Sequence, residues 1–159
     1  EELTRAMTPF SQKPGDVTVL RNRLQDVMWE DVGVMRDADG LQRGLKRIAE
    51  IDDELSSVGV AADNLAFNLS WHDWLNLRSL IDMSMVIAKA ALSRENSRGA
   101  HFREDFPDAG AMQESYFTLA SGYGDAISVT RAPVQFTIVK PGETLLGEDE
   151  AETLIKAAQ

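Results

Sequence analysis

The chain has 159 residues, 43% hydrophobic and 26% charged, which is typical of one soluble globular domain. It has no cysteine, so disulfides, iron–sulfur ligation and thiolate zinc sites are excluded. Its 26 Asp and Glu outnumber its 16 Lys and Arg, and the resulting net charge of −10 argues against nucleic acid as a partner.

The first residues lack an initiator Met and a secretory signal, so we expect a cytoplasmic piece cut from a longer protein. No apolar run approaches the roughly 18 residues that a membrane-spanning helix needs. Residues 1–15 contain Pro9, Pro14 and Gly15, and we interpret them as a lead-in to the first long element.

Two amphipathic helices are expected next. Asp16 is the predicted N-cap of the first, which Gly33 ends; its apolar residues recur every three or four positions: Val17, Leu20, Leu24, Val27 and Met28. Asp39, followed three residues later by Gln42, resembles a capping box for the second helix, which should end near Gly59. Its apolar face comprises Leu41, Leu45, Ile48, Ile51 and Leu55.

A third helix is predicted from Trp71 to about Arg94, with Ser70 as its N-cap. Its apolar residues surround most of the helix instead of following one face. A helix of that kind is buried on most sides. We therefore expect it at the centre of the helical part, or between that part and another domain.

The periodicity changes to two after Gly110, and strands are predicted at 116–119, 126–131 and 134–139. Pro133 should mark a break or an edge between the last two, because proline cannot donate a hydrogen bond to a sheet. The predicted fold class is mainly α. An antiparallel three-helix bundle with a charged loop (16–107) precedes a small antiparallel β-sheet or hairpin (108–142) and an acidic tail (143–159) with a short helix around 150–158.

Few residues suggest chemistry. Gly122 and Gly124 begin like a dinucleotide fingerprint, but Ile127 takes the third glycine position and the flanking elements are strands, so a hairpin turn is expected. With only two histidines, His72 and His101, no metal site is expected. We interpret the acidic pairs Asp52-Asp53 and Glu30-Asp31 as surface charge, and the tryptophans as core or interface anchors.

The loop from 97 to 107 combines arginines, carboxylates, a histidine and two phenylalanines around a glycine. Two roles fit these residues equally well. The loop is either a local network of Arg–carboxylate pairs that holds the third helix to the sheet, or a surface that docks against another domain. The candidate residues are Ser97, Arg98, Gly99, His101, Arg103 and Asp105.

Residues 95–107 (ENSRGAHFREDFP) closely resemble a signature late in the flavoprotein subunits of fumarate reductase and succinate dehydrogenase; L-aspartate oxidase is a relative. Residues 24–36 (LQDVMWEDVGVMR) are similar to the opening of that family's C-terminal helical domain, and Gly40-Leu41 and Leu77–Leu80 also agree. The resemblance is good over about 17–107, and the strands beyond look like the family's variable extension.

The resemblance implies FAD for the full-length parent, a flavin-linked oxidoreductase of dicarboxylates. The family's FAD-binding and substrate-binding segments are absent here, so no catalytic, cofactor-binding or metal residue carries over, and we expect this chain alone to be inactive and without FAD. The implied role is to pack against the flavin domain and stabilise it. An iron–sulfur subunit of the parent is a further implied partner, and such partners would bring the parent to the inner face of the membrane.

The isolated chain is expected to cover its exposed apolar surface by self-association. The alternative interpretation is an independent helical protein-interaction module whose likeness to flavoproteins is accidental. A stand-alone enzyme is the least favoured, because no nucleophile–base pair or cofactor cradle is visible.

Overall fold

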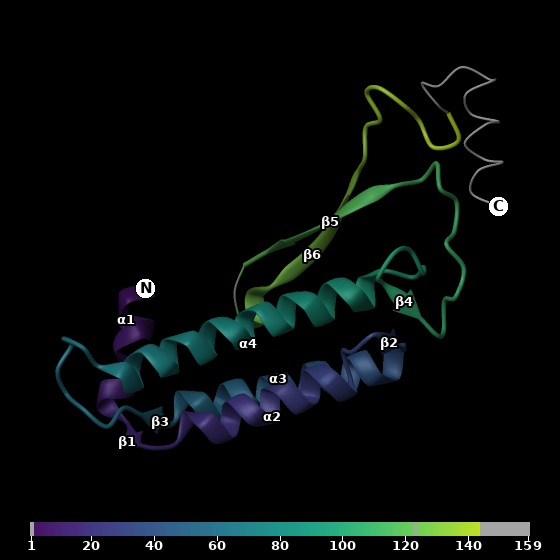
Figure 1. Ribbon diagram of the computed structural model, residues 1–159. Helices are drawn as coiled ribbons and strands as arrows, with labels where there is room; N and C mark the ends of the chain where they lie inside the picture. The colour runs from purple at the N-terminus through teal and green to yellow at the C-terminus, as the bar shows by residue number, and fades with distance from the viewer. Residues whose placement is uncertain (1, 123, 144–159) are drawn as a thin grey trace, which may run out of the picture.

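The computed structural model describes residues 2–122 and 124–143 (Figure 1). Three helices run antiparallel and pack side by side, with the third above the first two in Figure 1. They are α2 (Val17–Glu30), α3 (Ala38–Ser56) and α4 (Leu69–Ser93), preceded by α1 (Glu2–Met7) and the short 3-10 helix η1 (Thr8–Ser11). The predicted three-helix bundle is confirmed, and the expected lead-in forms a helix of its own.

Two short parallel strand pairs tie the ends of the bundle. β1 (Lys13–Pro14) pairs with β3 (Val58–Gly59) at the end where α2 begins and α3 finishes. At the other end, β2 (Met35–Arg36) pairs with β4 (Phe102–Arg103). The second pair brings the charged loop after α4 next to the turn between α2 and α3.

Aspartates cap both α2 and α3. The predicted N-cap Asp16 is confirmed, because its carboxylate accepts a hydrogen bond from the Thr18 amide at 2.8 Å. The prediction for α3 was wrong by two positions. Asp37 has extended backbone angles and accepts from Gly40 N at 2.6 Å, whereas Asp39 already lies in the first helical turn.

The cap of α4 is Asn68, not Ser70. The side-chain oxygen Oδ1 of Asn68 accepts from Trp71 N at 3.0 Å, and the Ser70 hydroxyl donates to the same oxygen at 2.8 Å. The Asn68 amide nitrogen also donates to Ala62 O and Asn64 O. Asn68 therefore anchors the preceding linker as well as the helix, which serine could not do with a single hydroxyl.

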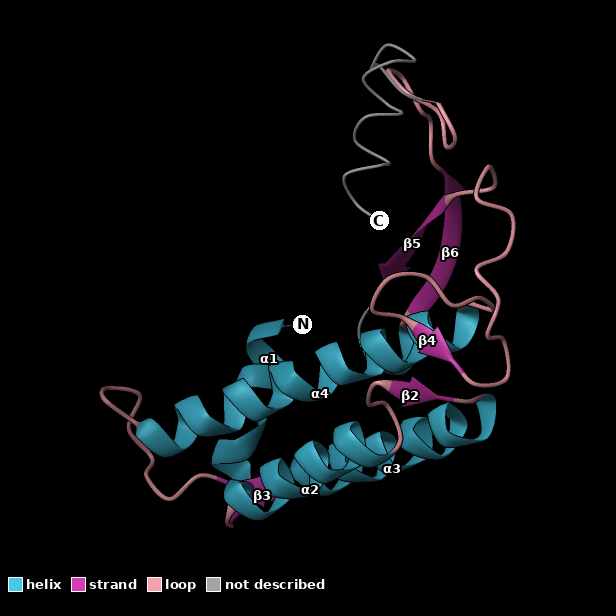
Figure 2. Cartoon of the chain, turned by 45° about the vertical axis from the view of Figure 1, so that its right-hand side comes forward, coloured by secondary structure: helices cyan, strands magenta, loops and turns pink. Residues whose placement is uncertain are grey.

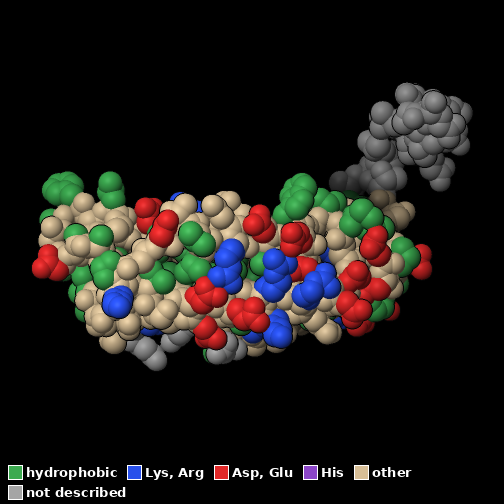
Figure 3. Space-filling model, turned by 90° about the horizontal axis from the view of Figure 1, so that it is seen from below, with side chains coloured by type: hydrophobic (Ala, Val, Ile, Leu, Met, Phe, Trp, Pro, Cys, Tyr) green, Lys and Arg blue, Asp and Glu red, His purple; other side chains and the backbone are tan. Residues whose placement is uncertain are grey.

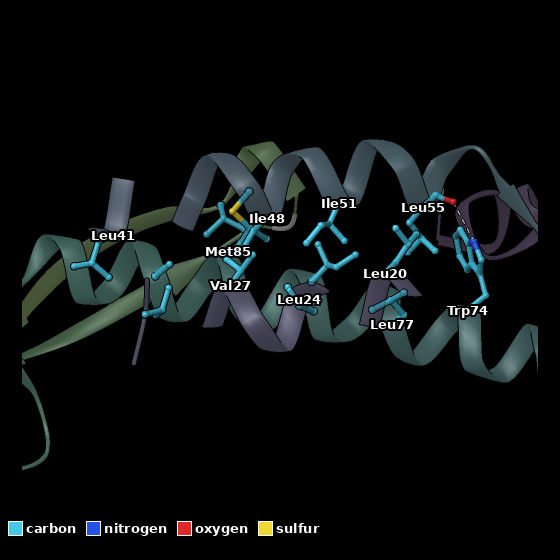
Figure 4. Close-up of a cluster of buried hydrophobic side chains, with 14 of the residues drawn as sticks. Leu20, Leu24, Val27, Leu41, Ile48, Ile51, Leu55, Trp74, Leu77 and Met85 are labelled. Atoms are coloured by element: carbon cyan, nitrogen blue, oxygen red, sulfur yellow. Dashed lines mark hydrogen bonds between the residues drawn. The ribbon is translucent and has the colours of Figure 1, made fainter. Parts of the chain in front are cut away.

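The hydrophobic core lies between the three long helices (Figure 4). Each contributes side chains at helical spacing: Leu20, Leu24 and Val27 from α2, Leu41, Ile48, Ile51 and Leu55 from α3, and Trp74, Leu77, Ile81, Met85 and Ala88 from α4. The Trp74 indole is 1% exposed and donates to Val58 O at 3.0 Å and Leu55 O at 3.2 Å. This side chain thus joins the start of α4 to the end of α3.

The β extension is one hairpin of β5 (Tyr116–Ser121) and β6 (Ser128–Pro133), with Ser121 opposite Ser128. The 3-10 helix η2 (Gly124–Ala126) follows the turn, so β6 begins two residues later than predicted. The predicted third strand at 134–139 is wrong. Val134 N makes one more bond to Ser115 O at 2.9 Å, after which the chain has no strand structure up to residue 139.

The hairpin crosses α4 on the side away from α2 and α3 (Figure 2). Polar contacts hold it there. Lys89 Nζ donates to Ile127 O at 3.0 Å, and Gly124 N donates to Asp82 Oδ1 at 3.3 Å. Arg131 donates to Ser93 O. The predicted helix in the acidic tail lies outside the described residues.

Candidate functional site

Arg103, in the loop after α4, is almost fully buried, with 1% of its surface exposed. Its Nε and Nη2 donate to the two oxygens of Asp105 at 2.7 and 2.6 Å, a two-pronged ion pair. Its Nη1 donates to three carbonyl oxygens at the end of α4: Ala91 (3.1 Å), Leu92 (3.2 Å) and Arg94 (3.0 Å). The guanidinium therefore adds a donor to carbonyls at the end of α4, of which Ala91 O also accepts from Arg94 N, and its charge suits the negative end of the helix dipole.

Asp105 continues this contact to a second helix. Its Oδ2 accepts a hydrogen bond from Ala38 N, the first residue of α3, at 2.9 Å. The hydrogen bond from Arg103 and, to a lesser extent, the one from Ala38 lower the pKa of Asp105 to about 2. The pair therefore links the C-terminus of α4 to the N-terminus of α3. The positive Arg103 lies at the C-terminus and the negative Asp105 at the N-terminus, which is the arrangement that helix dipoles favour.

Ser97 and Gly99 shape the loop. The Ser97 hydroxyl accepts from Arg103 N at 2.9 Å and donates to Phe106 O at 2.8 Å, so it holds both sides of the loop together. Gly99 has a φ of +60° inside a tight turn in which Arg98 and His101 exchange backbone hydrogen bonds of 2.9 and 3.2 Å. A side chain would strain that left-handed conformation.

Arg98 contacts the segment that leads to β5. Its guanidinium donates to Ala109 O, to Ala111 O at 2.6 Å and to Ser115 Oγ at 3.4 Å. Among the described residues of the loop, Arg103 is the arginine that pairs with a carboxylate, and that pair holds α4 to α3 and not to the sheet. Docking of the loop against another domain stays a prediction.

His101 is 8% exposed, and its Nδ1 lies 3.0 Å from Arg36 Nη1. Because arginine can only donate, Nδ1 accepts, and the ring proton resides on Nε2. Nε2 is buried without a hydrogen-bond partner among the described residues. Burial and the charges of Arg94, Arg36 and Arg103 lower the pKa of His101; the Arg94 backbone opposes this shift without reversing it. The imidazole is thus neutral at pH 7.

A pocket of about 700 Å³ opens beside this histidine, between the last turns of α4 and β5. Sequence reasoning singled out Arg98 and His101 but missed Arg36 and Arg94, which also line it. Arg36 reaches the site through the pairing of β2 with β4, where Glu104 N donates to Arg36 O at 2.7 Å. In the sequence, the feature that could have pointed to Arg36 was its position at the end of the 24–36 motif.

Two of the remaining acidic candidates differ from the prediction of surface charge. Asp52 is only partly exposed, and its buried Oδ1 lies 3.7 Å from Arg78 Nη1. Glu30 is exposed, but Asp31 is 3% exposed and accepts from Arg43 at 2.7 Å and from Arg47 at 2.8 Å. Asp31 is therefore a buried structural anion, and its interpretation as surface charge was wrong. In the described ranges, no three His, Asp or Glu side chains gather as a metal ion would require, and no helix is long and apolar enough to cross a membrane.

Residues 21–145 match the family described as the fumarate reductase flavoprotein C-terminus. The chain belongs to this family. An uncharacterised FAD-dependent oxidoreductase of Methanocaldococcus jannaschii is 34% identical over 110 residues, which are 68% of this chain and 20% of that protein. An L-aspartate oxidase of Ralstonia nicotianae is 38% identical over 94 residues, 58% of this chain and 16% of the oxidase.

The solved structure of Mycobacterium smegmatis Sdh1 in complex with UQ1 has a TM-score of 0.73 and 30% identity, covering 86% of this chain and 24% of that one. The resemblance read from the motifs is thus confirmed, and the family match includes the β5–β6 hairpin, which the motifs identified less specifically. The chain spans about a quarter or less of the proteins it matches.

One relative is described as FAD-dependent, but the glycine turn of this chain differs from a dinucleotide fingerprint in conformation and in context. Gly122 has a φ of +92°, and a Cβ there would collide with Ala126 O, so the glycine serves the hairpin turn. The turn joins two antiparallel strands, whereas a dinucleotide fingerprint joins a strand to a helix.

Proposed function

We propose that this chain is the non-catalytic C-terminal helical domain of an FAD-dependent dicarboxylate oxidoreductase, and that it packs against the flavin domain of the same polypeptide and stabilises it. The flavin and the reacting residues belong to the remainder of the parent protein. This chain supplies a rigid bundle whose helix ends are fixed by Arg103 and Asp105.

One observation carries the proposal: a row of apolar side chains along the outer face of α4. Leu80, Met83 and Ile87 follow each other at spacings of three and four, so they share one side of the helix. Their exposed fractions are 46%, 56% and 43%. A second large protein surface would remove this row from water, which is the ordinary reason for such a row on a soluble domain.

Two further parts of the proposal concern the parent. An iron–sulfur subunit would be a partner of the assembled protein, and partners of that kind would hold the parent at the inner face of the membrane. The similarity to Mycobacterium smegmatis Sdh1, whose structure contains UQ1, supports a link to quinone-dependent complexes.

The test replaces one apolar residue of the row in the full-length parent and in the 159-residue chain. Met83→Ser should lower the FAD content and thermal midpoint of the parent while changing the midpoint of the short chain little. Val19→Ser on α2 is a matched control, because Val19 and Met83 are both 56% exposed. Equal effects of M83S in both proteins, or equal effects of the two variants in the parent, would contradict the proposal.

The bundle's complete core favours a second candidate, an independent helical interaction module. Reading the gene upstream of Glu1 separates the two, because the first proposal requires a G-x-G-x-x-G segment in a strand–turn–helix context. A stop codon directly upstream would favour the module. We also propose that the isolated chain self-associates through the apolar row; a strict monomer in light scattering would contradict that.

A further inference from the structure

The arginines of the described chain fall into two classes. One class lies within 4.0 Å of a carboxylate oxygen: Arg5, Arg21, Arg23, Arg43, Arg47, Arg78 and Arg103. The other class forms no such pair with any described residue, and it comprises Arg36, Arg94, Arg98 and Arg131. The first three of these line the one pocket between α4 and β5 described above.

This pocket concentrates positive charge in a chain whose net charge is −10. None of its described lining residues is Asp or Glu. Its other wall is largely apolar and comes from Ile87, Ala90 and Ala91 of α4 and from Phe117 of β5. A concave site of this volume, with an apolar wall and a few convergent polar groups, is typical of small-ligand binding.

The three arginines are held in place by uncharged acceptors. Arg36 Nε donates to Gly33 O at 2.6 Å and Val32 O at 3.1 Å, and Arg94 Nη2 donates to Asn96 Oδ1 at 3.2 Å. Arg98 donates to backbone carbonyls, as described above. Burial and the nearby Arg94 charge lower the pKa of Arg36, as expected where cations lie close together without an anion.

A bound anion would relieve this repulsion, and two features favour a carboxylate over a phosphate. The pocket lies at the C-terminal end of α4, where the helix dipole opposes a doubly charged group. The apolar wall suits a carbon skeleton. The guanidinium fork itself suits the oxygens of either anion.

We propose that the pocket lined by Arg36, Arg94 and Arg98 is a carboxylate-binding site, with Ile87, Ala90 and Phe117 against the ligand's carbon skeleton. The carboxylate belongs either to a small organic acid or to an Asp or Glu of the parent polypeptide outside this chain. Ile87 belongs both to the α4 row and to the wall of this pocket. The proposal rests on the three arginines and not on how the flavin domain packs, so it can be tested separately from the proposed function.

Benzoate and its neutral, nearly isosteric analogue benzamide are suitable probes. The 159-residue chain is titrated with each while NMR follows the amides of Ala90, Phe117 and Thr118. Benzoate should bind at least about tenfold more tightly than benzamide, because the charge-assisted hydrogen bonds are lost in the amide. Equal affinities would overturn the proposal.

Arg94→Gln is the informative variant, because the Arg94 side chain donates only to Asn96 among the described residues and supports no helix end. It should weaken benzoate binding about tenfold and leave benzamide binding unchanged. Arg23→Gln, which removes an arginine paired with Glu54, is the matched control and should change neither. An R94Q affinity for benzoate within twofold of the unsubstituted chain would overturn the proposal.

The same titration of the full-length parent distinguishes the two sources. Benzoate binding there with similar affinity indicates a free organic acid. Exclusion of benzoate, together with an R94Q loss of thermal midpoint larger in the parent than in the short chain, indicates a carboxylate from the parent's own polypeptide. Exclusion without that extra loss would overturn the proposal, since something other than a carboxylate would then fill the pocket.

Discussion

Two arginine clusters flank the turn between α2 and α3, and they use their charges differently. On the face formed by α2 and α3, basic and acidic side chains alternate (Figure 3), and Arg43 and Arg47 meet the buried Asp31. Around the pocket near α4, the hydrogen bonds that Arg36 and Arg94 make with described residues all go to uncharged acceptors. Charge is thus balanced where the chain's own helices meet, and left unbalanced where a concave surface faces outward.

Close backbone approach makes the balanced cluster possible. A Cβ on Gly44 of α3 would lie 3.0 Å from Asp31 Cβ and 3.1 Å from Val32 Cγ2, so a larger residue would push these side chains back by a few tenths of an ångström. That approach buries Asp31, and a buried carboxylate requires partners that compensate for its lost hydration. The pocket differs in this respect, because none of its described lining residues is a buried Asp or Glu that would pair with the arginines.

The largest expected effect of a side-chain change is at Arg103. Arg103→Ala would remove the side-chain donor from three carbonyls at the end of α4 and would leave the Asp105 carboxylate with its single bond from Ala38 N. The free energy of unfolding in urea should fall by about 3–5 kcal/mol, because a buried guanidinium loses several charge-assisted hydrogen bonds at once. Arg23→Ala, which breaks the exposed pair with Glu54, should cost only about 0–1 kcal/mol. Similar losses for the two variants would show that Arg103 is not a helix-linking residue.

Asp31→Asn tests the balanced cluster directly. The amide keeps the shape but loses the charge that both arginines contact, and the arginines can turn toward water because Arg43 is 60% exposed at its side chain. The free energy of unfolding should therefore fall by about 1–3 kcal/mol. Asp26→Asn, an exposed carboxylate on the same helix, should have little effect. An unchanged free energy of unfolding in D31N would mean that the buried charge contributes nothing to stability.

The contribution of Asp105 to the stability of the fold should depend on pH. Its pKa in the folded state is about 2, below its ordinary value of 3.8, so its contribution to stability is complete above pH 4 and is lost as pH falls toward 2. Asp105→Asn should cost about 1–2 kcal/mol at neutral pH and flatten the stability profile between pH 4 and 2. Urea unfolding at several pH values measures this, with the exposed Asp108→Asn as control. An unchanged profile in D105N would contradict the assignment.

Local sequence patterns predicted which helices form better than they predicted where each helix begins. The spacing of Leu20, Leu24 and Val27 predicted α2 because its buried face is a property of the helix alone. The caps of α3 and α4 were each misplaced by two residues, since neighbouring polar residues compete for one role. Residues 134–139 have strand-forming composition, but after Pro133, which has no N–H to donate, they have no strand partner.

The candidate site was predictable only in part, because its contacts join parts of the chain that lie far apart in the sequence. The loop's motif identified Arg98 and Arg103, but which of them pairs with Asp105 depends on the position of the α4 end, which spacing does not give. Arg36 joins the site because β2 pairs with β4, which lies more than 60 residues later in the chain, and this pairing brings the Arg36 side chain to His101. Long-range pairing of two-residue strands leaves no periodic signal in a sequence.

The smallest expected effect concerns the unbalanced pocket. Arg94→Gln removes a charge that has no carboxylate partner among the described residues, so the free energy of unfolding of the 159-residue chain should change by no more than about 0.5 kcal/mol. The same change should raise the pKa of His101, because the Arg94 charge is the largest electrostatic cause of its lowering after burial. NMR titration of the imidazole measures the shift, with Arg23→Gln as the control that leaves it unchanged. A large loss of stability with no change in the pKa of His101 would place Arg94 with Arg103 among the structural arginines, and the contrast between the two clusters would disappear.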